Sequence, residues 1–192
     1  MYEVELKASL KEISAEEAVQ RALSLGFVYD RTLIETDTYY NGIDRNFMDT
    51  DEALRIRSCS CRHDGKEETR TAFITYKGPK LDGISSTRQE YETTVGDAST
   101  VRTILETLGY SPVLTVSKNR REFKSADGIT LCVDLVKGLP PYIELEAIVP
   151  EQKEKDDALH RLFHMLHELG IPKENTTRKS YLEMLLKART SL

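Results

Sequence analysis

Residues 2–8 read Tyr2-Glu3-Val4-Glu5-Leu6-Lys7-Ala8, in which apolar and charged side chains alternate. Because successive side chains of a β-strand point to opposite faces, this segment predicts a strand with one apolar face and one charged face. Related alternation returns at 54–57, 74–77 and 143–147. Further strands are expected at 36–41, 87–95, 113–123 and 129–136, which gives about eight strands in all.

Helical spacing of apolar residues separates these strands. Helices are predicted at about 15–25, 97–108, 157–169 and 178–188. Ser14 and Glu17 form a capping-box pattern at the start of the first helix, and Gly26 is a typical stop signal at its end. Two successive units of strand, helix and three strands predict an α+β fold, a closed eight-stranded antiparallel β-barrel covered by about four helices.

The alternation alone leaves open whether the charged faces point to solvent or to the barrel lumen. Four amphipathic helices need apolar sheet surface to cover, and Val4, Leu54 and Leu145 supply it only if they face outward. The charged side chains then line the lumen, where burial would be prohibitive unless water or a ligand compensates them. A metal-bound triphosphate fits such a tunnel, because Arg and Lys bind the anion and carboxylates bind a hard divalent cation.

Composition narrows the class of protein. The 192 residues are the length of a single domain, here 1–192, and 39% of them are hydrophobic. Acidic residues outnumber basic ones, 32 to 27, which argues against a nucleic-acid-binding or membrane-surface protein. The sequence contains neither an apolar run long enough for a membrane span nor a signal-peptide pattern. We therefore expect a cytoplasmic protein with a small-molecule partner, and a homodimer is compatible with these patterns.

Seven short motifs together resemble the CYTH superfamily, the triphosphate tunnel metalloenzymes. The first is Glu3-Val4-Glu5-Leu6-Lys7, which matches the family's E-x-E-x-K signature. The others follow in the family's order: Leu54-Arg55-Ile56-Arg57, Thr75-Tyr76-Lys77-Gly78, Arg88-Gln89-Glu90-Tyr91-Glu92, Lys118-Asn119-Arg120-Arg121, Asp134 and Glu144-Leu145-Glu146. In size, and in residues 36–40 and 180–183, the chain is most similar to the class IV adenylyl cyclase branch.

This resemblance implies roles for individual residues. The implied triphosphate-binding residues are Arg55, Arg57, Lys77, Arg88, Lys118 and Arg120. The implied ligands of Mg²⁺ or Mn²⁺ are Glu3, Glu5, Asp134, Glu144 and Glu146. Lys7 is the candidate catalytic residue, a proton acceptor beside the carboxylates, and the resemblance also places it among the triphosphate-binding cations; of the two roles we favour phosphate binding.

The resemblance implies a metal-dependent enzyme that acts on a triphosphate. The leading interpretation is an adenylyl cyclase, a phosphorus–oxygen lyase that converts ATP to cyclic AMP and pyrophosphate. The alternative is a triphosphatase that hydrolyses thiamine triphosphate, inorganic tripolyphosphate or a nucleoside triphosphate. A third interpretation is a non-catalytic polyphosphate or nucleotide sensor, but carboxylates near the phosphates have little use in a protein that only binds them.

Overall fold

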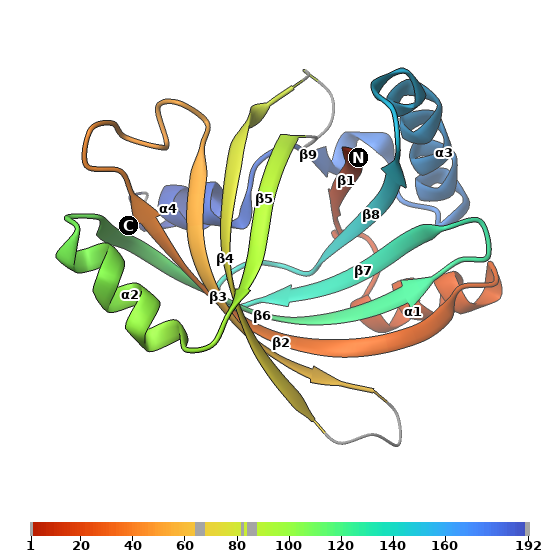
Figure 1. The fold of residues 1–192 in the computed structure, drawn as a ribbon. Coiled ribbons are helices and arrows are strands. Elements are labelled where there is room, and N and C mark those ends of the chain that lie inside the picture. Colours follow the sequence, from red (N-terminus) through yellow and green to blue (C-terminus); the bar gives the residue numbers. More distant parts are fainter. Residues whose placement is uncertain (1, 64–67, 82, 84–87, 191–192) are drawn as a thin grey trace.

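The computed structural model describes residues 2–63, 68–81, 83 and 88–190. Its main feature is one curved antiparallel sheet, with the strand order β5-β4-β3-β2-β6-β7-β8-β1-β9 (Figure 1). The strands are β1 (Tyr2–Ser9), β2 (Val28–Asn41), β3 (Ala53–Arg62), β4 (Thr69–Lys80), β5 (Arg88–Val95), β6 (Ser111–Lys124), β7 (Ile129–Val136), β8 (Tyr142–Val149) and β9 (Thr176–Thr177).

In the part of the chain that the structure describes, four α-helices accompany the sheet, as predicted. They are α1 (Ala15–Ser24), α2 (Ala98–Thr107), α3 (Lys155–Glu168) and α4 (Tyr181–Thr190), and short 3₁₀ turns lie at Gln152–Glu154 and Lys173–Asn175. Ser14 caps α1 by accepting a hydrogen bond from the backbone N–H of Glu17 at 3.1 Å. Gly26 has a φ of 87°, the left-handed conformation expected after a helix. Within the described residues, no helix has the length and apolar character that crossing a membrane requires.

The last helix begins later than predicted. Thr177, the residue before the predicted start of this helix, pairs with Lys7 as part of β9. Ser180 is the actual cap, because its hydroxyl accepts from the Glu183 backbone N–H at 3.1 Å. The Glu183 carboxylate in turn accepts from the Ser180 backbone N–H at 2.6 Å. This reciprocal capping box fixes the start of α4 at Tyr181.

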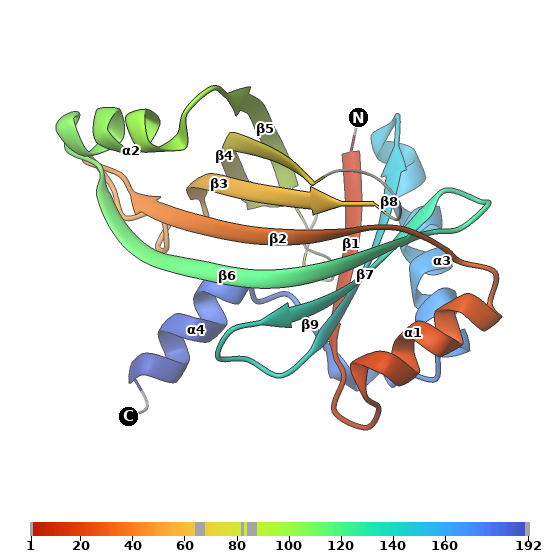
Figure 2. The same ribbon diagram turned by 90° about the horizontal axis from the view of Figure 1, so that it is seen from below.

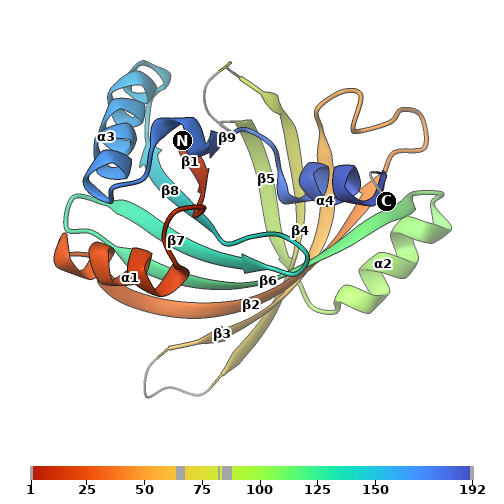
Figure 3. The same cartoon turned by 180° about the vertical axis from the view of Figure 1, so that it is seen from behind.

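The helices cover different parts of the sheet. Figures 1 and 3 show α1 and α3 at one end of the sheet and α2 at the other, and Figure 2 shows α2 and α4 on opposite sides of β2 and β6. Under α1 and α3, the core contains the apolar faces of β1, β7 and β8, including Val4, Leu6 and Leu145. The helix α2 packs against Leu54 and Ile56 of β3. These are the apolar positions predicted to face outward.

The expected closed eight-stranded barrel differs from the observed sheet. The described strands form an open half-barrel of nine, with β5 at one edge and the two-residue β9 beyond β1 at the other. Strands β1 and β5 both carry glutamates towards the cavity, Glu3 and Glu5 on one and Glu90 and Glu92 on the other. Directly paired, these edges would oppose like charges, which destabilises a sheet. The outer edge of β1 pairs with Thr176 and Thr177 instead.

Candidate active site

A cavity of about 360 Å³ lies on the face of the sheet opposite the packed faces of β1 and β3. Charged side chains of β1–β6 and β8 line it, together with the loop before β3 and the start of α4. On β1, Glu3, Glu5 and Lys7 reach the cavity, whereas Val4 and Leu6 lie in the core on the other face. The predicted inward direction of the charged side chains is therefore confirmed.

All the cations predicted to bind a triphosphate line this cavity: Arg55, Arg57, Lys77, Arg88, Lys118 and Arg120. Arg55 and Arg57 share one face of β3 because they are two residues apart. The Nε and Nη2 atoms of Arg57 donate to the two carboxylate oxygens of Asp37, both at 2.7 Å. Arg55 Nη1 donates to the same carboxylate at 3.4 Å. Asp37 thus fixes both guanidinium groups in the cavity, while their role in phosphate binding stays a prediction.

Strand β6 supplies a second pair of cations, Lys118 and Arg120. Arg120 Nε and Nη2 donate to the two oxygens of Asp134, both at 2.7 Å, and Arg120 also contacts Glu144. Lys118 Nζ lies 3.0 Å from Glu35. Burial and the Arg120 charge lower the pKa of Lys118, but Asp134 and Glu35 outweigh them, so the pKa is raised. Lys118 is therefore a permanent cation in this site.

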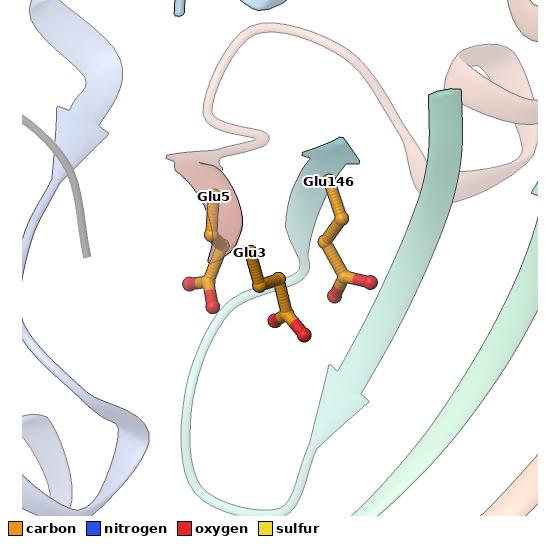
Figure 4. A group of neighbouring side chains, drawn as sticks. All are labelled: Glu3, Glu5 and Glu146. Atoms are coloured by element: carbon orange, nitrogen blue, oxygen red, sulfur yellow. The ribbon is translucent and has the colours of Figure 1, made fainter. Parts of the chain in front are cut away.

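Three of the five predicted metal ligands form a cluster at the edge of the cavity. Glu3 and Glu5 of β1 and Glu146 of β8 each place a carboxylate oxygen within 4.8 Å of the other two (Figure 4). The pairing of Glu5 with Glu146 across the two strands brings them together. Burial raises the pKa of Glu146 to about 8, with the carboxylates of Glu3 and Glu144 adding to the effect against the opposing charge of Arg120.

The other two predicted metal ligands, Asp134 and Glu144, lie outside this carboxylate cluster. Asp134 is fully buried behind Arg120, and it is paired with Arg120 and with the hydroxyl of Tyr181 at 2.7 Å. Glu144 lies between Arg120 and Lys7, with its carboxylate 3.1 Å from Lys7 Nζ. Burial raises the pKa of Glu144, but Arg120 and Lys7 outweigh it and hold the pKa well below its usual range. The structure thus places both carboxylates as partners of cations, and metal binding by them stays a prediction.

Lys7, the predicted catalytic residue, lies in the cavity between two carboxylates. Its Nζ is 3.3 Å from Glu5 and 3.1 Å from Glu144. Burial lowers the pKa of Lys7, but these two carboxylates outweigh burial and raise it above its usual range. A lysine that stays protonated is a poor proton acceptor and a good phosphate ligand. The two ion pairs and the raised pKa therefore favour phosphate binding as the role of Lys7, which stays a prediction.

Sequence reasoning missed three residues of this site. Glu35 and Asp37 are 2% and 3% exposed and pair with the arginines and Lys118. The available signal was two carboxylates two residues apart, Glu35 and Asp37, which share one face of β2, but the predicted strand began only at residue 36 and therefore left Glu35 out. Tyr181 places its ring 4.6 Å from Lys7 Nζ and 5.6 Å from Lys118 Nζ, distances suited to cation–π contacts. Tyr181 lies in the segment 180–183 that resembles the class IV branch, but this resemblance assigned no role to it.

The carboxylate cluster fits a hard divalent cation. Its donors are oxygens alone, which Mg²⁺ and Mn²⁺ prefer over softer metals. Burial is the main cause of the raised pKa of Glu146, and the neighbouring carboxylates of Glu3 and Glu144 add to it against the charge of Arg120. A bound cation would stabilise the ionised form of these carboxylates. Glu3, Glu5 and Glu146 are thus the residues here that could hold a metal next to the basic side of the cavity.

Comparison with known proteins agrees with the geometry. The Methanocaldococcus jannaschii protein named "Putative adenylate cyclase MJ0240" is 40% identical over 184 residues, which cover 96% of this chain and 98% of that protein. The solved structure of the PH1819 protein from Pyrococcus horikoshii is 38% identical, with a TM-score of 0.86 over 97% of this chain and 99% of that one.

A more distant solved structure shares the fold alone. The Hippeastrum protein HpAC1, for which a dominant triphosphatase activity is described, is 18% identical with a TM-score of 0.63 over 99% of this chain and 97% of that one. The family profile of the CYTH domain matches residues 1–181, nearly the whole chain. The protein therefore belongs to the CYTH domain family.

Proposed function

We propose that this protein is a metal-dependent adenylyl cyclase that converts ATP to cyclic AMP and pyrophosphate. The observation that carries the proposal is one cavity in which seven cationic side chains, Lys7 and the six predicted triphosphate ligands, face a cluster of three carboxylates. A chain of phosphates with a divalent cation has the charge that both sets require. The name of the Methanocaldococcus jannaschii relative supports the choice of cyclase.

The basic residues would hold the triphosphate through charge-assisted hydrogen bonds. Arg57 is already oriented by Asp37, and Arg120 by Asp134, so neither has to be ordered when the substrate binds. Such preorganised charges stabilise the negative charge that develops on the leaving pyrophosphate. Lys7, protonated between Glu5 and Glu144, would contribute a further positive charge to the phosphates.

Glu3, Glu5 and Glu146 would hold Mg²⁺ or Mn²⁺. Such an ion, when bound, polarises a phosphoryl group and neutralises part of its charge. In the cyclase the ribose 3′-hydroxyl attacks the α-phosphate, so the chain must position the ribose as well as the phosphates. In a triphosphatase, water attacks the terminal phosphate instead. Both reactions use the same charges.

A triphosphatase is the second candidate. The Hippeastrum protein has this fold and a dominant triphosphatase activity, so the fold by itself does not select the cyclase. The two reactions are separated by their products. We would incubate the protein with ATP, tripolyphosphate or thiamine triphosphate, each with Mg²⁺ or Mn²⁺, and identify the products by mass spectrometry. Cyclic AMP from ATP supports the cyclase, whereas orthophosphate without cyclic AMP supports the triphosphatase.

A variant of the carboxylate cluster tests the metal site. Glu3→Gln combined with Glu146→Gln should abolish turnover even at high metal concentration, because two of the three anionic ligands lose their charge. Glu16→Gln is a matched control, since Glu16 lies in α1 and is largely exposed. Wild-type turnover in the double variant would refute this metal site.

A further inference from the structure

One part of the cavity is apolar, in contrast to its charged interior. Five of its lining residues form what we call the apolar wall: Tyr39, Phe47, Met48, Ala53 and Leu182. Tyr39 and Ala53 come from the sheet, Phe47 and Met48 from the loop before β3, and Leu182 from α4. The functional assignments of the charged residues leave this wall unexplained.

The apolar wall lies directly beside the cationic residues. Tyr39 of β2 is paired with Arg55 of β3, and Ala53 is paired with Lys77 of β4. Ala53 lies two residues from Arg55 on the same face of β3, a step of about 7 Å along the strand. A group attached to phosphates held at Arg55 and Lys77 could therefore reach the wall.

The loop side of the wall is held firmly against the sheet. Asp51 has a φ of 55°, a conformation that residues other than glycine rarely adopt without support from their surroundings. Its carboxylate accepts from the Lys80 backbone N–H at 2.9 Å, and its carbonyl accepts from Arg88 Nη1 at 3.1 Å. Lys80 Nζ also lies 3.9 Å from Glu183 of α4. The loop and α4 are thus tied together around the wall.

The apolar wall offers a ligand van der Waals contact rather than a charged partner. Met48 is 40% exposed, so its thioether has apolar surface available for a ligand. The carboxylates nearby already have partners: Asp51 with Lys80, Glu52 with Arg45 at 2.7 Å and Glu183 with the Ser180 N–H. Methionine and tyrosine side chains pack well against flat rings, and sulfur adds a favourable contact with aromatic groups.

We propose that the apolar wall is the subsite for the planar aromatic group of an organic triphosphate. This inference rests on the proposed triphosphate function and extends it, because inorganic tripolyphosphate has no group to cover the wall. The adenine of ATP and the rings of thiamine triphosphate share the required chemistry. Separate binding measurements with ATP and with thiamine triphosphate distinguish which of these two ligands the wall accepts.

Isothermal titration calorimetry of the full chain, without divalent metal so that turnover does not occur, tests the inference. The ligands are ATP, thiamine triphosphate and tripolyphosphate. Met48→Ala removes a contact of the wall, and Ala53→Leu fills the space in front of it. Leu135→Ala is the control. The exposed fraction of Leu135, 43%, is similar to the 40% of Met48, but Leu135 is not among the residues that line the cavity.

We expect both wall variants to weaken an organic triphosphate by about threefold or more. Tripolyphosphate affinity should stay within about twofold in every variant, and Leu135→Ala should change none of the affinities. Unchanged affinity for both organic ligands in both wall variants would overturn this inference but not the proposed function. An equal loss of affinity for tripolyphosphate would have the same consequence. Wild-type protein that binds none of the three ligands would overturn the proposed function as well.

Discussion

Replacing Arg120 with methionine would remove the cation that three carboxylates share. Arg120 donates two hydrogen bonds of 2.7 Å to Asp134, contacts Glu144 and lies 3.3 Å from Glu146. Asp134 is fully buried, so it cannot recover its solvation when the guanidinium is lost. Methionine fills much of the same volume, which separates the loss of charge from the creation of a cavity.

The expected loss of stability follows from these contacts. Removing one partner of a buried ion pair costs roughly 3–5 kcal/mol. Lys118 remains 3.8 Å from Asp134, and Lys7 remains 3.1 Å from Glu144, so partial compensation persists. We therefore expect the free energy of unfolding to fall by about 3 kcal/mol at pH 7, the lower end of that range.

The loss should depend on pH in one direction. Against the effect of burial, Arg120 and Lys7 hold the pKa of Glu144 below its usual value. Stability from such a group is present above the pKa of the unfolded chain and disappears as pH falls through the lower folded pKa. Without Arg120 the folded pKa rises, so the deficit of the variant should be largest at pH 7 and smaller near pH 4.

Urea unfolding followed by circular dichroism at pH 7 and near pH 4 measures both effects. Arg121→Met is the matched control, because Arg121 is the next residue in the chain. Its Nη2 atom lies 3.3 Å from the carboxylate of Glu16, a side chain that is 74% exposed. An exposed pair contributes about 1 kcal/mol or less. Equal losses in the two variants, or a deficit for Arg120→Met that grows towards low pH, would refute the reasoning.

Three further predictions concern the cavity. Mn²⁺ binding at pH 7 should release about one proton, because Glu146 has a pKa of about 8 and must ionise to bind the ion. Calorimetric titrations in buffers of different ionisation enthalpy would detect the released proton, and identical heats in all buffers would contradict the prediction. Tyr181→Phe should lower stability in urea by about 1.5–3 kcal/mol through loss of the hydrogen bond to Asp134, whereas no change would show that this bond is unimportant. Arg55→Ala and Lys118→Ala should each weaken triphosphate binding in calorimetric titrations without unfolding the protein, and unchanged affinity in both would remove them from the binding site.

Much of the fold was predictable because alternation in a strand has direct physical consequences. Once Val4 and Leu6 are assigned to a helix-covered face, Glu3, Glu5 and Lys7 must lie on the other. The register between strands was not predictable, because it depends on neighbours far apart in sequence. Register decides that Glu5 meets Glu146, and therefore which carboxylates form a cluster.

The same limit explains the errors. Barrel closure was inferred from the number of strands, but the charges on facing edges act against pairing of β1 with β5. The hydrogen bond between Tyr181 and Asp134 joins residues 47 positions apart, so no local sequence pattern predicts it. For Asp134, the sequence indicates a carboxylate in the site, but only the structure shows that its partner is Arg120.

A crystal structure of the protein with Mn²⁺ and a non-hydrolysable ATP analogue would test the central claim most directly. The account predicts an anomalous difference peak for Mn²⁺ among Glu3, Glu5 and Glu146, with the phosphates against Arg55 and Lys118 inside the cavity. Mn²⁺ and phosphates bound on the outer face of the sheet, with the carboxylate cluster in the cavity unligated, would contradict it.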